Sequence, residues 1–219
     1  MAVRLSLGKD NDSTEDAYPD TGRIEAFSDG VFAVAITLLV FNIRLPELRS
    51  GGQLGEQLLT QWTSYAAYVV SFVTVGIFWA NHHHMFHFIK GSNHLLAMVN
   101  VLFLMCISFL PFSTSLAAAF VRSPGSRRTA VLVYVGTFLS SALLFTAVWL
   151  FAVWQRLIEQ YLDSSAVRIM TRKYFSGVVS YFIAFATAFW STTISLVIVV
   201  GVALLFFLPP SQFPRRSCG

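Results

Sequence analysis

The chain has 219 residues, of which 55% are hydrophobic and only 12% are charged. A soluble domain carries about 25% charged residues, so this composition excludes an ordinary soluble protein. The net charge of +4 does not indicate nucleic-acid binding, because the basic residues lie in loops between apolar runs. Long unbroken apolar runs predict an all-α membrane protein.

The apolar runs follow a polar N-terminal segment. Residues 1–22 lack the apolar region of a cleavable signal, so we expect a disordered cytoplasmic tail. The runs cover residues 27–43, 58–88, 95–121, 130–154 and 174–208. As one helix the last run would be about 52 Å long, against a hydrocarbon core of about 30 Å. We therefore divide it near Trp190 and predict a six-helix transmembrane domain over 23–208, then a cytoplasmic C-terminal tail over 209–219.

The basic residues give this domain an orientation. With six spans, ten Lys and Arg residues lie on the side of the two tails and five on the opposite side. Because cytoplasmic loops carry the excess of positive charge, we expect a multi-pass protein with both termini in the cytoplasm.

The first apolar run carries Arg23 and Asp29 near its start. A carboxylate at mid-span costs about 2.5–3.5 kcal/mol, so Asp29 needs a partner or water. Four residues further along share an arc of about 100° on a helix; they are Val34, Thr37, Leu38 and Phe41. Asp29 lies about 140° from Val34, so we expect it to point into the subunit's own bundle. By geometry alone this stripe is either a packing face or a pore lining.

The second run ends in a polar segment at the same predicted depth. Trp79 and His83 fall on one face, and we predict that Ser28 and Asp29 meet one of them in a buried polar network. The alternatives are a metal or redox site and a proton-coupled site; the histidines concerned are His82, His83, His84 and His87. Because no cysteine lies near and carboxylates are few, we predict no metal site and no cofactor.

The string RIEAFSDG at residues 23–30 resembles the signature RxxxFSDG of one family, the bacterial homologues of the endolysosomal potassium channel, transmembrane protein 175. Phe78-Trp79, His82-His83, Asn100 and Pro111-Phe112 are similar to the family's second and third helices. The resemblance covers most of the chain, and its most specific part is the first three spans.

The resemblance implies a homotetramer in the bacterial inner membrane, with a central pore lined by the first helix. It implies a potassium-permeable channel with moderate preference for K⁺ over Na⁺, and neither an enzyme nor a nucleic-acid-binding protein. It assigns the pore constriction to Val34, Leu38 and Phe41 and the selectivity layer to Thr37. The motif residues Arg23, Phe27, Ser28 and Asp29 would brace the pore helix, together with the predicted partners Trp79 and His83.

Two positions depart from the family pattern. Val34 stands where the family usually has Ile or Leu, and Phe41 stands where it has Leu. The chain also lacks a TVGYG-like filter and an Arg-rich span, so we expect neither strong carbonyl-type selection nor steep voltage gating. The alternative function is a proton-coupled transporter that uses Asp29 and the histidines of the second span.

Overall fold

The computed structural model describes residues 21–44, 54–159 and 162–207. The helices of these residues are α1 (Gly22–Leu38), the 3₁₀ helix η1 (Leu39–Asn42), α2 (Leu54–Thr60), α3 (Trp62–Phe88), α4 (His94–Phe120), α5 (Arg127–Trp154), α6 (Ser164–Thr187) and α7 (Thr192–Phe207). The predicted all-α fold is confirmed, with a seventh α-helix, the short α2, among the described residues. The predicted tails fall almost wholly outside the described residues.

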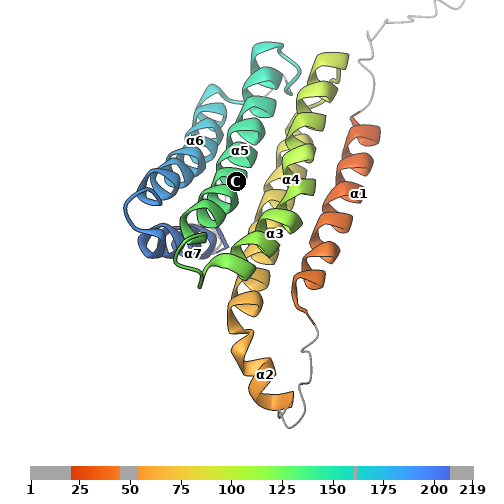
Figure 1. Ribbon diagram of the computed structural model, residues 1–219. Helices are drawn as coiled ribbons and strands as arrows, with labels where there is room; N and C mark the ends of the chain where they lie inside the picture. Colours follow the sequence, from red (N-terminus) through yellow and green to blue (C-terminus); the bar gives the residue numbers. More distant parts are fainter. Residues whose placement is uncertain (1–20, 45–53, 160–161, 208–219) are drawn as a thin grey trace, which may run out of the picture.

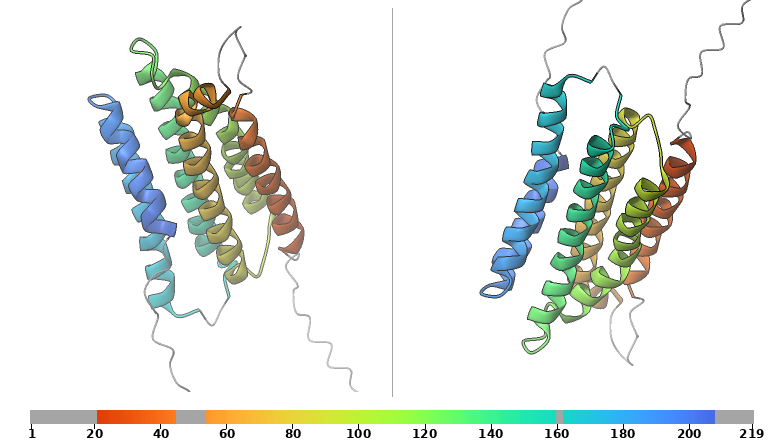
Figure 2. Two further views of the ribbon diagram at one scale, coloured as in Figure 1. Left: turned by 90° about the horizontal axis from the view of Figure 1, so that it is seen from below. Right: turned by 90° about the horizontal axis from the view of Figure 1, so that it is seen from above.

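The long helices run alternately up and down (Figures 1 and 2). The backbone N–H of Lys90 donates to the carbonyl of Leu157 at 2.9 Å, which joins the α3–α4 and α5–α6 loops at one end. At the other end, Arg127 Nη2 donates to Thr193 Oγ1 at 2.8 Å, which joins the starts of α5 and α7. α1 begins at the first of these ends (Figure 1). We call this the near end and the opposite one the far end.

The predicted division of the last apolar run is confirmed, because α6 ends at Thr187 and α7 begins at Thr192. α6 begins well before the apolar run that predicted it. Asp163 caps its first turn by accepting hydrogen bonds from the hydroxyl and the backbone N–H of Ser165. These bonds lower the pKa of the exposed Asp163 carboxyl. The run at 58–88 is divided as well, at Gln61 between α2 and α3.

Four helical segments are long and apolar enough to cross a membrane: Gly22–Asn42, α3, α4 and α5. α7 is apolar but has 16 residues, about 24 Å of helix. α6 has 24 residues and carries Arg168, Arg172 and Lys173 in its first half. The composition and these helices make the chain a multi-pass membrane protein.

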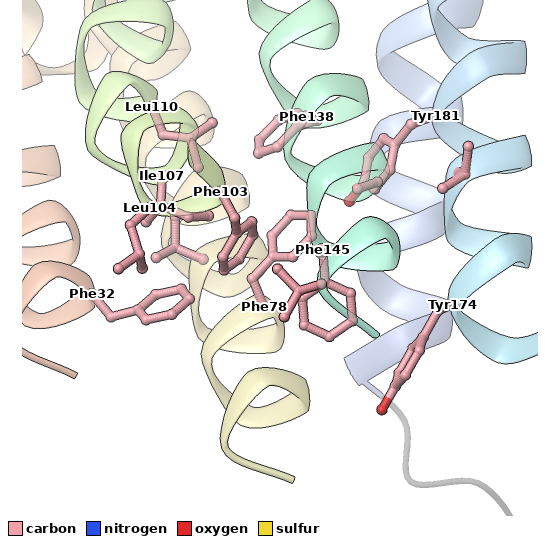
Figure 3. Packing of buried hydrophobic residues seen from close by; sticks show 14 of the residues in the cluster. Phe32, Phe78, Phe103, Leu104, Ile107, Leu110, Phe138, Phe145, Tyr174 and Tyr181 are labelled. Atoms are coloured by element: carbon pink, nitrogen blue, oxygen red, sulfur yellow. The ribbon is translucent and has the colours of Figure 1, made fainter. Parts of the chain in front are cut away.

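A chain of aromatic side chains forms the middle of the core (Figure 3). Phe32 of α1 lies 5.9 Å from Phe103 of α4, and Phe103 lies 5.6 Å from Phe145 of α5, between ring centroids. Phe145 in turn meets Tyr174 of α6 edge-on at 4.9 Å. Aromatic pairs of this kind contribute about 0.5–1.5 kcal/mol beyond the burial of their area. The rings therefore tie four helices into one core.

α1 lies at the edge of this bundle. It packs against α3 and α4 and not against α5, α6 or α7 (Figure 1). An edge helix has one covered face and one uncovered face, and this position determines the geometry of the candidate site.

Candidate functional site

The two faces of α1 and η1 differ in burial although both are largely apolar. The covered face is almost inaccessible; it consists of Ser28, Phe32, Ala35 and Leu39. The uncovered face carries the predicted constriction residues, with Val34 58%, Leu38 41% and Phe41 77% exposed. Thr37 is exposed on the same face. The stripe that the sequence predicted is therefore left uncovered within one chain.

The end of the stripe is not regular α-helix. η1 follows Leu38, and in a 3₁₀ turn the side chains at i and i+3 eclipse one another, so Phe41 lies in line with Leu38. The tighter helix also rises faster, at about 2.0 Å per residue. Val34 and Phe41 are consequently about 12 Å apart along the axis, rather than the ~10 Å of a continuous α-helix.

The hydroxyl of Thr37 is oriented by its own helix. Its Oγ1 donates to the carbonyl of Ala33 at 3.0 Å and to that of Val34 at 2.9 Å. A hydroxyl has one hydrogen and two acceptor lone pairs. Because the hydrogen is directed to the backbone, the oxygen lone pairs are available to coordinate a cation.

A buried polar network fixes the covered face of α1. Asn100 of α4 donates from Nδ2 to Ser28 Oγ at 3.0 Å, and His82 Nε2 of α3 lies 2.9 Å from Asn100 Oδ1. All three side chains are almost completely buried. Three helices are thus joined by side chains that have no access to water.

The network has one consistent set of donors. Ser28 Oγ donates to the carbonyl of Ile24 at 2.7 Å, so its oxygen must accept from the amide group of Asn100. Asn100 then presents its oxygen to His82, which must carry its proton on Nε2. The position of one serine on α1 therefore decides the amide orientation on α4 and the tautomer on α3.

Aromatic rings enclose His82. Its ring stacks on Phe86 at 4.5 Å and on Phe103 at 5.6 Å, between centroids, and Phe32 lies 5.6 Å away. A polar network in such surroundings is costly to leave incomplete, because an unpaired buried group keeps its full desolvation penalty.

The structure differs here from the predicted network. The expected partner His83 is exposed and stacks on Trp79 with 6.1 Å between centroids, while its neighbour His82 takes the buried position. In the sequence, Asn100 stands out only as part of the family match. An asparagine within an apolar helix was the available signal, since such a group needs a partner.

Asp29 lies at the margin of the covered face. Its Oδ1 accepts from Trp79 Nε1 at 2.9 Å, so the two predicted residues do meet. Both residues are nevertheless exposed. Contrary to the prediction, Asp29 does not point into the bundle. Ser28, one residue earlier, is the side chain that does. The contact links α1 to α3 from outside the core.

The remaining motif residues lie on the uncovered face. Phe27 is 57% exposed, and Arg23 is exposed in the second residue of α1. Neither contributes to the polar network within the described part of one chain. As for metal ligands, no group of three or more His, Cys, Asp or Glu side chains comes together in residues 21–44, 54–159 and 162–207.

Comparison with known proteins relates this arrangement to one family. Residues 23–111 match the family model described as endosomal/lysosomal potassium channel TMEM175. A protein of Chamaesiphon minutus named as a potassium channel is 40% identical over 192 residues, which cover 86% of this chain and 94% of the relative. A chicken (Gallus gallus) protein named as the endosomal/lysosomal proton channel TMEM175 is 35% identical over 141 residues, 60% of this chain and 27% of the relative.

A solved structure is similar over the same range. It is described as a lysosomal potassium-selective channel TMEM175 homologue from Chamaesiphon minutus, with a TM-score of 0.78 and 38% sequence identity. The match covers 85% of this chain and 95% of that one.

Proposed function

Because the chain belongs to the family of the endosomal/lysosomal potassium channel TMEM175, a family of ion channels and not of enzymes, we propose that it is a potassium-permeable cation channel. The single observation that carries this proposal is the uncovered face of α1 and η1. It combines three bulky apolar side chains with one hydroxyl oxygen whose lone pairs are free to coordinate a cation.

The uncovered face supports the proposal of a homotetramer. One helix at the edge of a bundle cannot enclose an ion path, so several copies of α1 must meet around an axis. Four copies would form rings of Val34, Leu38 and Phe41 in which hydrophobic side chains gate by dewetting. The covered face keeps its contacts to α3 and α4, and the uncovered faces form the lining.

The membrane topology extends the observed alternation. We propose six spans, with α6 and α7 as the last two, and both termini in the cytoplasm of a bacterial cell. The near end then faces the cytoplasm, in agreement with the excess of Lys and Arg on that side. α2 would lie at the far end, between the first two spans.

Selectivity would arise at the level of Thr37. An ion that passes the apolar rings loses part of its hydration, and no carbonyl cage replaces it. Four Thr37 oxygens, each with its hydrogen turned to the backbone, would offer partial compensation. This arrangement supports moderate preference for K⁺ over Na⁺. The lack of an Arg-rich span in the sequence supports weak voltage dependence.

The network of Ser28, Asn100 and His82 would support the pore helix on its covered face, away from the ion path. It fixes the rotation of α1 about its axis, because Ser28 must meet Asn100 and cannot turn outward without leaving buried groups unpaired. A fixed rotation keeps Val34 and Leu38 on the axis side. In this role the network positions the pore helix and does not touch the ion.

The test is passive ion flux from liposomes that carry the purified protein, under a K⁺ gradient and then under a Na⁺ gradient. We expect K⁺ flux above Na⁺ flux, and a severalfold increase in Leu38→Ala, because the variant widens one apolar ring. Ile36→Ala is the matched control, since Ile36 is a partly buried aliphatic side chain on the opposite side of the same helix. Its flux should equal that of the wild type.

Two results would contradict the proposal. Equal increases in K⁺ flux in Leu38→Ala and Ile36→Ala would show that the stripe does not line the ion path. Solute uptake that needs a pH gradient, with no passive K⁺ flux in either variant, would instead support a proton-coupled transporter that uses Asp29 and the histidines of α3. A pH-sensitive dye in the same liposomes measures proton flux, which is the activity named for the chicken relative.

A further inference from the structure

A groove lies at the far end of the bundle, away from α1. It has a volume of about 220 Å³ and runs between the start of α3, the end of α4 and α7. Small side chains create it, because Ala66 and Ala67 on α3 face Ala117 and Ala118 on α4. Val199 of α7 lines the opposite wall. The residues from Trp62 to Val70 follow it for about 12 Å along α3.

The groove is almost wholly apolar and has the size of a ligand site. An apolar cavity of about 150 Å³ is large enough to take up benzene, so 220 Å³ accommodates a length of hydrocarbon chain. Tyr134 lines the groove, but its hydroxyl is bound to Ser71 at 2.9 Å and is buried. Apart from the Thr63 hydroxyl, the walls therefore offer only apolar packing.

Two arginines lie beside residues that line the groove. Arg122 follows the lining residue Val121, and its Nη1 reaches the carbonyl of Thr60 at 3.4 Å, across the start of α3. Arg127 Nη2 bonds Thr193 Oγ1, one turn before the lining residue Leu196 of α7.

Both guanidinium groups keep unused donors. Each binds one neutral oxygen, and no carboxylate of the described residues forms an ion pair with either of them. The Nε of Arg127 is buried and has no hydrogen-bond partner in the described part of the chain. A guanidinium has five N–H donors in a fork that matches a phosphate group.

We propose that this groove is a binding site for an anionic phospholipid. One acyl chain fills the apolar groove between α3, α4 and α7, and the phosphate group binds Arg122 and Arg127 at its mouth. The occupant follows from the combination: a hydrocarbon-sized cleft in a membrane protein, with positive charge that no described acid neutralises. Trp62, 59% exposed at the same level, is a side chain suited to the membrane interface.

Trp62 also provides the measurement. The full-length channel is reconstituted in phosphatidylcholine vesicles with increasing fractions of brominated phosphatidylglycerol or brominated phosphatidylcholine. Bromine quenches nearby tryptophan fluorescence. The chain has five tryptophans, so the Trp62 signal is the difference between wild type and Trp62→Phe. We expect half-maximal quenching at a severalfold lower fraction of phosphatidylglycerol, since each arginine near a membrane surface is worth roughly a fivefold preference.

The variants separate a built site from general surface charge. Arg122→Gln with Arg127→Gln should abolish the preference. Arg128→Gln should retain it, because Arg128 is an exposed neighbour without a hydrogen bond to α2 or α7 among the described residues. Ala118→Leu fills the groove and should also abolish the preference with both arginines present. Ala119→Leu, on the exposed side of the same turn, is its control.

Three outcomes would overturn the proposal. Equal quenching by the two lipids in the wild type would show that the groove does not recognise the anionic headgroup. A preference for phosphatidylglycerol that persists in Ala118→Leu would show that the arginines attract the lipid as general surface charge, without a bound acyl chain in the groove. Quenching of Trp62 by neither lipid would mean that protein, and not lipid, covers the groove. Size-exclusion profiles identical to the wild type establish that each variant is folded.

Discussion

α1 and α5 are similarly apolar helices with different surroundings. In the most apolar stretch of α5, 56% of the residues are buried, against 22% for α1 with η1. α5 packs against α4, α6 and α7, whereas α1 has neighbours on one side only. An apolar helix is therefore not necessarily a core helix in a membrane protein.

The difference in burial between α1 and α5 depends on which partners cover the apolar surface of each helix. In lipid, an uncovered apolar face costs little, so burial is not enforced by hydrophobicity as it is in water. α5 uses its surface to pack the core, while α1 uses one face for packing and leaves the other for a further partner. The polar residues show the same division, since Ser28 is buried and Thr37 is exposed on one helix.

The largest expected effect tests the difference in burial directly. Phe145→Ala in α5 should destabilise the protein by about 3–5 kcal/mol, because it leaves a cavity between Phe103 and Tyr174. Phe27→Ala in α1 removes the same side chain from an exposed position and should cost less than about 1 kcal/mol. Thermal unfolding of the purified protein measures both. A loss in Phe27→Ala as large as in Phe145→Ala would mean that another subunit covers Phe27.

The next prediction concerns the anchor of α1. Asn100→Leu removes the donor to Ser28 and the acceptor for His82, which leaves the buried Nε2–H of His82 unpaired and Ser28 with only its bond to Ile24. We expect a loss of about 2–3 kcal/mol, since an unpaired buried group costs about 1–3 kcal/mol and the bond to Ser28 is lost as well. Ser108→Ala, an exposed serine of the same helix with a bond only to its own turn, should change stability by less than ~0.5 kcal/mol. Equal melting temperatures of the two variants would exclude the anchoring role.

Two adjacent leucines separate stability from conduction. Leu39 is fully buried and Leu38 is 41% exposed, although they follow one another in sequence. Leu39→Ala should cost about 2–3 kcal/mol, whereas Leu38→Ala should cost less than about 1 kcal/mol. In the flux assay the order reverses, and Leu38→Ala shows the larger effect. The same order in both assays would show that the two faces of α1 are not distinct.

The smallest expected effect lies at the margin between the two faces. Trp79→Phe removes the hydrogen bond to Asp29, and because both residues are exposed we expect a loss of only about 0.5–1.5 kcal/mol. Asp29→Asn retains an oxygen acceptor and should cost less than Trp79→Phe, as measured by thermal unfolding. A larger loss in Asp29→Asn would show that its charge, and not this hydrogen bond, holds α1.

Much of the architecture could be predicted from residue patterns. The all-α class, the uncharged runs and the break before Thr192 follow from composition and from the length of a membrane-spanning helix. The start of α6 could not be read from hydropathy, because six of its first ten residues are polar or charged, and Asp163 caps its first turn. α2 was missed because the run at 58–88 continues across the break at Gln61 without a proline or glycine.

At the site, periodicity on one helix was sufficient to group Val34, Thr37, Leu38 and Phe41 on one face, because that grouping depends only on the repeat of the helix. The choice between His82 and His83 was not determined in this way. Adjacent residues point about 100° apart, and which of them is buried depends on where α4 brings Asn100. The sequence by itself determined the helices, their faces and the stripe, whereas the tertiary packing alone decided which face of α1 is covered and which histidine joins the network.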